Sequence, residues 1–71
     1  MDAFEKEEII SAFLLRPSIC QDKLGKKIKN CQEIKDNFNK DMNVPGGCSS
    51  CRKKAVFQKY RPMIWKNIID D

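Results

Sequence analysis

Residues 45–54 read PGGCSSCRKK, and the interpretation of the whole chain starts from this stretch. It places Cys48 and Cys51 directly after a Pro-Gly-Gly turn and directly before three basic residues. Glycine permits the positive φ angle of a type II turn, so residues 44–47 are predicted to form one. Two thiolates in a Cys-x-x-Cys pair can bind one tetrahedral Zn²⁺ from a tight knuckle. A helix beginning near Ser49 would direct its positive end at both sulfurs.

Two further cysteines complete a possible set of four zinc ligands. A chain of 71 residues buries only about 60% of its unfolded surface, so it benefits from a metal or disulfide staple. The acidic N-terminus does not resemble a signal peptide, so a cytoplasmic location is expected, where cysteines bind metal more often than they form disulfides. Two disulfides or unpaired thiols are the alternatives. The sequence therefore predicts one structural Zn²⁺, bound by Cys20, Cys31, Cys48 and Cys51.

The first segment, residues 1–16, is predicted to be an acidic helix. Asp2 and Glu5 have the spacing of a capping box, and Pro17 disfavours helical backbone at Arg16. Apolar residues recur at helical spacing and predict one buried stripe. The stripe consists of Phe4, Ile9, Ile10, Phe13 and Leu14.

The second segment, residues 17–43, has helical periodicity and contains two cysteines. In one continuous helix, Cys20 and Cys31 would lie about 16 Å apart. Two sulfurs on one zinc are at most about 4.6 Å apart, and a disulfide needs Cα atoms within about 7 Å. Gly25 disfavours a helix and Asn30 can cap a new one. We therefore predict a break, with a short turn after Cys20 and a helix that begins at Cys31.

The third segment, residues 44–71, is predicted to hold the cysteine knuckle and two basic helices. The first of these helices should run from about Ser49 to Tyr60, and Pro62 should lie in the first turn of a last, short helix. Sustained β-type alternation is absent from the sequence. We therefore predict that residues 1–71 form a single small all-α domain, with three to four short helices around a zinc knuckle.

Charge is unevenly distributed along the chain. Residues 1–15 carry one basic and four acidic side chains, residues 16–43 carry seven and four, and residues 44–71 carry six and two. This asymmetry indicates an acidic arm on a basic body, which favours an anionic partner. A solvated surface on a lysine-rich protein is the alternative explanation. No apolar run approaches the length of a membrane span, so no membrane association is expected.

Basic side chains after the cysteine pair are the candidate nucleic-acid contacts, because lysine and arginine at this density can follow phosphates. They are Arg52, Lys53, Lys54, Lys59 and Arg61. The predicted function is a small non-catalytic zinc-binding module that regulates or assists nucleic-acid machinery, bound to the nucleic acid or to a protein of that machinery. The cysteine spacing matches no common zinc-finger pattern.

A protein–protein adaptor is the alternative function. Trp65 and Ile68 lie in an apolar C-terminal segment, where they could anchor an acidic partner protein. An enzyme with a small-molecule substrate is not expected, because the chain has no histidine and its serines have no evident activating partner. A redox role for the Cys48 and Cys51 thiols is a remote alternative that lacks the usual βαβ context.

Overall fold

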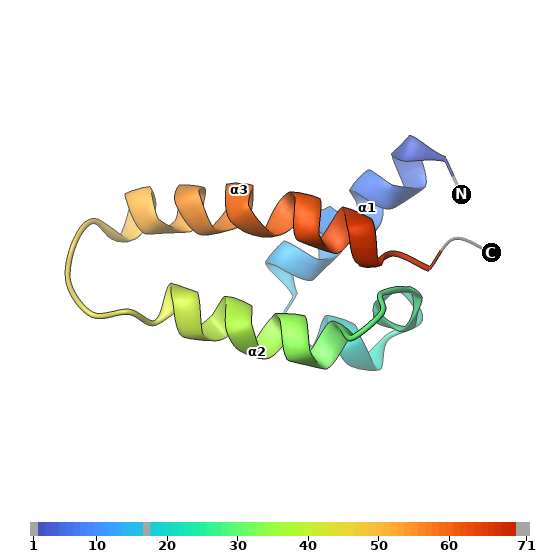
Figure 1. Cartoon of the computed structure of the whole chain (residues 1–71), viewed down its shortest axis with the longest axis horizontal. Coiled ribbons are helices and arrows are strands. Elements are labelled where there is room, and N and C mark those ends of the chain that lie inside the picture. Colours follow the sequence, from blue (N-terminus) through green and yellow to red (C-terminus); the bar gives the residue numbers. More distant parts are fainter. Residues whose placement is uncertain (1, 17, 70–71) are drawn as a thin grey trace.

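The computed structural model describes residues 2–16 and 18–69, and its elements are helical. Figure 1 shows two long antiparallel helices, α2 and α3, lying side by side, with α1 crossing them. The α-helices span Ala3–Leu15 (α1), Cys31–Met42 (α2) and Ser49–Asn67 (α3). Two short 3-10 helices, Ile19–Gln21 (η1) and Gly25–Lys27 (η2), connect α1 to α2. The expected all-α class is confirmed for the described residues.

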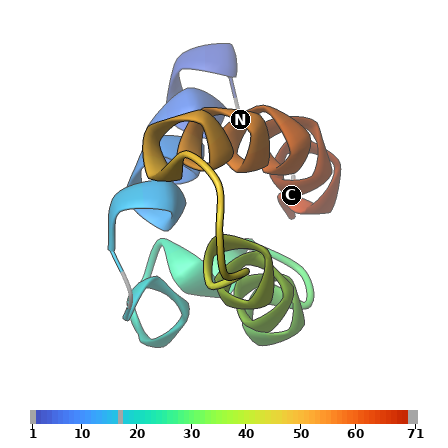
Figure 2. The same cartoon turned by 90° about the vertical axis from the view of Figure 1, so that its left-hand side faces the viewer.

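The predicted N-terminal helix is confirmed at both ends. The side chain of Asp2 accepts a hydrogen bond from the backbone N–H of Glu5 at 2.9 Å, and the helix ends at Leu15. Pro17 itself lies outside the described residues. The predicted apolar stripe is buried except for Phe4, which is 77% exposed. Phe4 remains exposed because the first turns of α1 extend beyond α3 (Figures 1 and 2).

The predicted break between Cys20 and Cys31 is also confirmed. Cys20 lies within η1, η2 follows it, and α2 begins at Cys31. Asn30 precedes α2 with a left-handed φ of 57°, but its side chain makes no cap hydrogen bond. Gly25 is buried in this connection, where a Cβ atom would lie within 2.5 Å of the Cα of Cys20 and closer still to the carbonyl of Ile19. Only glycine fits this approach of two backbone segments.

The prediction of a separate last helix is wrong, because α3 continues without interruption through Pro62. Proline in a helix interior removes one backbone hydrogen bond and costs about 3 kcal/mol. Tertiary packing offsets this cost, because a row of residues at four-residue spacing is buried along α3 and just past its end. The row consists of Val56, Tyr60, Ile64 and Ile68.

The core lies where the three helices meet (Figure 2). The ring of Phe38 on α2 is at its centre, with ring centroids at 5.9 Å from Phe13, 5.9 Å from Phe57 and 5.4 Å from Tyr60. An isolated antiparallel bridge, Ile28 with Ile68, holds the end of α3 against the connection before α2. The opposite end of the α2–α3 hairpin, with its connecting loop, extends away from α1 (Figure 1).

Candidate functional site at the tip of the helical hairpin

The candidate site is the free end of the α2–α3 hairpin, residues 44–54, which we call the tip. The tip forms one extremity of a molecule that measures 41 × 21 × 16 Å (Figure 1). Gly46 and Gly47 have φ angles of 84° and 80°, so the positive φ expected for the turn is confirmed. Every tip residue is exposed except Arg52, which is half-buried.

The two tip cysteines converge at the start of α3. Cys48 is the N-cap residue, and its Sγ accepts a hydrogen bond from the backbone N–H of Cys51 at 3.2 Å. The Cys51 thiol donates to the same sulfur, with 2.6 Å between the Sγ atoms. This hydrogen bond lowers the pKa of the Cys48 thiol and raises the pKa of the Cys51 thiol. The pair is therefore an exposed dithiol with one more acidic member.

The four-cysteine zinc site is not supported by the structure. Cys20 and Cys31 form a disulfide, with 5.6 Å between their Cα atoms, whereas Cys48 and Cys51 are free thiols. Cys31 begins α2 and the tip follows its other end, so about 18 Å of helix separates the two pairs. Within residues 2–16 and 18–69, no group of three or more histidine, cysteine or acidic side chains is placed to hold a metal ion.

Three of the five predicted nucleic-acid contacts lie together at the tip. Arg52 donates to the carbonyl of Gly46 and folds back over the turn. Lys53 Nζ lies 5.5 Å from the ring centroid of Phe57, and Lys54 is exposed. These three residues form a basic cluster beside the dithiol.

The other two predicted contacts are engaged in ion pairs farther along α3. Lys59 Nζ lies 3.0 Å from Asp41 Oδ2, and Arg61 lies 3.1 Å from Glu7 Oε2 on α1. Surface ion pairs of this kind contribute about 0–1 kcal/mol, so they do not rigidly fix either side chain. They do neutralise much of the positive charge that the sequence assigned to this region.

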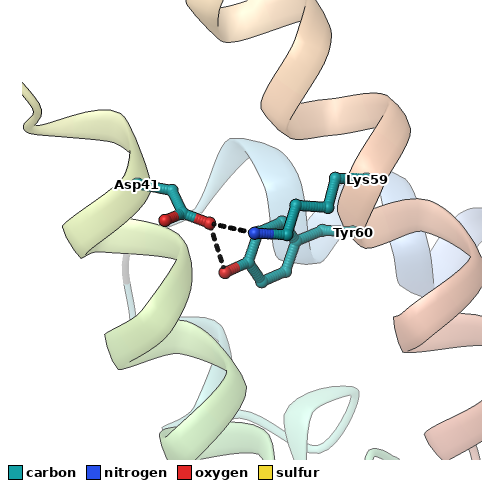
Figure 3. A network of polar contacts seen from close by, with 3 residues as sticks. All are labelled: Asp41, Lys59 and Tyr60. Carbon is teal, nitrogen blue, oxygen red and sulfur yellow. Dashed lines mark hydrogen bonds and ion pairs between the residues drawn. The ribbon is translucent and has the colours of Figure 1, made fainter.

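A polar network links α2 to α3 beside the core (Figure 3). Asp41 Oδ2 accepts from the Tyr60 hydroxyl at 2.7 Å and from Lys59 at 3.0 Å. Burial, together with the hydrogen bond to Asp41, raises the pKa of Tyr60 to about 12. Hydrogen bonds from Tyr60 and Lys59 lower the pKa of Asp41. Sequence reasoning missed this role of Asp41, because its partners are eighteen and nineteen residues away.

The two residues predicted to anchor a protein partner differ in accessibility. Ile68 is only 7% exposed and belongs to the core, so it offers little surface to a partner. Trp65 is half-buried and lies at a surface hollow of about 330 Å³, which also includes Glu7, Ile10, Pro62 and the basic residues Arg61 and Lys66. Lys6 Nζ lies 5.0 Å from the centroid of the Trp65 ring. Trp65 alone remains accessible as a candidate anchor.

No protein-family model, curated protein or solved structure matches this chain. No helix in the described part of the chain is long and apolar enough to cross a membrane. The functional argument therefore depends on the chemistry of the tip and of the hollow beside Trp65.

Proposed function

We propose that the protein is a small non-catalytic binding module that associates with nucleic acid through the basic cluster at its tip. The observation that carries the proposal is the basic run at the beginning of α3, in which Lys53 and Lys54 are exposed and Arg52 is half-buried. The first turn of α3 contains no acidic residue, although helix N-termini favour negative charge. The cluster therefore has an unfavourable electrostatic arrangement that a bound phosphate would relieve.

Geometry supports contact with a nucleic-acid backbone at the tip in particular. The tip lies beyond the packed core, so a duplex or single strand could reach it without displacing another element (Figure 1). Lys53 and Lys54 occupy adjacent exposed positions, and neither forms an ion pair with a described residue. Such contacts would bind phosphates without reading base sequence.

The test is salt-dependent binding of a labelled 20-base-pair duplex and of a labelled single strand. Replacing Lys53 and Lys54 with alanine should weaken binding to all sequences about equally and reduce the salt slope by about one to two. The matched control replaces Lys26 and Lys27, an exposed basic pair at the other end of the molecule. Equal effects of both double variants, or no binding by the unaltered protein at low salt, would contradict a nucleic-acid site at the tip.

The protein–protein adaptor remains the second candidate, and the hollow beside Trp65 favours it. An acidic peptide with one apolar side chain could pair with Arg61 or Lys66 while its apolar group enters the hollow. Binding of such a peptide that is weakened by Trp65→Ala, without any binding of nucleic acid, would support this function instead.

A further inference from the structure

The dithiol at the tip provides half of a zinc site, and none of the other residues that the structure describes is placed to complete it. Zn²⁺ in structural sites takes four nitrogen or sulfur ligands, while the tip offers the two sulfurs of Cys48 and Cys51. The chain has no histidine, and its other two cysteines form the Cys20–Cys31 disulfide. A zinc ion bound at the tip would therefore need its remaining ligands from outside this chain.

The tip is shaped to supply those ligands from a second copy. Cys48 and Cys51 are both exposed at the extremity of an elongated molecule, so two tips can meet before any other surfaces collide (Figure 1). A two-fold axis through the metal would give it four thiolates in two symmetry-related pairs, as in an isologous contact. We propose that two copies of this chain join tip to tip around one Zn²⁺, which is bound by Cys48 and Cys51 of each copy.

The local geometry fits this role with little change. In a tetrahedral site with Zn–S bonds of about 2.3 Å, two sulfurs lie about 3.8 Å apart. The sulfurs of Cys48 and Cys51 lie 2.6 Å apart, so the exposed side chains need to separate by about 1 Å. The backbone N–H of Cys51 already donates to the Cys48 sulfur at 3.2 Å. Hydrogen bonds of this kind orient and stabilise metal-bound thiolates.

Charge also favours the two-copy arrangement. One Zn²⁺ with four thiolates carries a net charge of −2, and each copy brings Arg52, Lys53 and Lys54 next to it. The basic clusters would repel one another in a metal-free contact, whereas the anionic centre between them offsets that repulsion. The zinc–thiolate centre thus links the two copies, and its four thiolates supply the negative charge that attracts the basic clusters. This inference does not depend on nucleic-acid binding, because it uses only the dithiol and its neighbours.

The test measures zinc content and mass of the 71-residue chain in solution. We expect one zinc per two chains, a dimer by sedimentation equilibrium, and complete conversion to monomer when a chelator removes the metal. Substitution with Co²⁺ should give the visible absorption typical of a tetrahedral four-thiolate site. Cys51→Ser should abolish metal binding and dimerisation while leaving the helical circular dichroism unchanged, because this side chain is exposed.

A double variant, Cys20→Ser with Cys31→Ser, distinguishes the two-copy site from a four-cysteine site within one chain. The two-copy site predicts that this variant keeps its zinc and its dimeric mass. Loss of zinc from this variant, a monomer that retains zinc, or a dimer that survives chelation would each overturn the proposal. A reduced chain that takes up no zinc would overturn it as well.

Discussion

The Nζ of Lys35 lies 3.0 Å from the carbonyl oxygen of Phe13, so a lysine on α2 caps the last turn of α1. The same ammonium group donates to the carbonyl of Arg16 at 3.1 Å and lies 4.9 Å from the centroid of the Phe13 ring. Lys35 is only 5% exposed, and its burial lowers its pKa. Carbonyls at the end of a helix lack partners within the helix. Lys35 therefore supplies a capping contact that α1 does not provide for itself.

Replacing Lys35 with methionine should destabilise the protein by about 1–3 kcal/mol, since the Phe13 carbonyl loses its lysine donor and, among the described residues, the Arg16 carbonyl keeps only the N–H of Ile19. The methionine preserves most of the apolar stem, which separates the lost hydrogen bonds from lost packing. Lys40→Met, on the exposed side of the same helix, is the matched control and should change stability by less than about 0.5 kcal/mol. Urea denaturation followed by circular dichroism measures both. Equal stability of the two variants would argue against the cap.

Tyr60 is the only tyrosine in the chain, so its ionisation can be followed directly by ultraviolet absorbance. The folded protein should titrate with a pKa near 12, and the denatured chain near 10. Asp41→Asn should lower the folded value, because it removes the negative charge that faces the phenol. A folded Tyr60 that titrates near 10 would contradict the network.

The same shift predicts how stability depends on pH. Between pH 10 and about 12 the folded state keeps the phenol proton that the unfolded chain loses. The stability that the raised pKa of Tyr60 contributes is therefore complete below pH 10. It is lost as the pH rises toward 12, by up to about 1.4 kcal/mol per pH unit. Tyr60→Phe should remove this part of the loss of stability at alkaline pH. The measurement is the difference in unfolding free energy between the unaltered protein and the Tyr60→Phe variant, taken at pH 9 and at pH 11.5.

The Cys20–Cys31 disulfide joins residues eleven positions apart, and its reduction should cost about 3 kcal/mol of stability. Alkylation of the non-reduced, metal-free protein should label only Cys48 and Cys51, as read by peptide mass spectrometry. Four labelled cysteines before reduction would show that the disulfide is absent. The variant Cys20→Ser with Cys31→Ser should have a lower melting temperature and remain helical.

Gly25→Ala should destabilise the connection between α1 and α2 by about 1–3 kcal/mol, because the new methyl group would overlap the backbone of Ile19 and Cys20. Gly46→Ala is the comparison: its φ of 84° is unfavourable for alanine, but nothing lies within 4 Å of the new methyl group. Its cost should be about 1–2 kcal/mol, from the backbone alone. Thermal denaturation of the two variants is the measurement, and a Gly25→Ala variant that is clearly more stable than Gly46→Ala would contradict the close packing of Gly25.

Local sequence determined where α1 begins and ends and where α2 begins. Asp2 can cap α1 because the hydrogen bond to Glu5 involves residues only three positions apart. The break between Cys20 and Cys31 was predictable from Gly25, which disfavours a helix. It was also predictable from the short distance that a disulfide or a shared metal requires between the two cysteines. These features depend on backbone preferences and on contacts within a few residues.

Tertiary structure alone decided which groups meet across helices. The sequence did not indicate that Cys20 bonds to Cys31 while Cys48 stays with Cys51, since the pairing depends on the length and direction of α2. It predicted a helix boundary at Pro62, but a buried row that includes Tyr60 and Ile64 keeps α3 continuous there. Packing over a whole helix face can outweigh the local cost of one proline. The residues next to Pro62 in the sequence do not reveal this, because the packing energy comes from contacts along the whole helix.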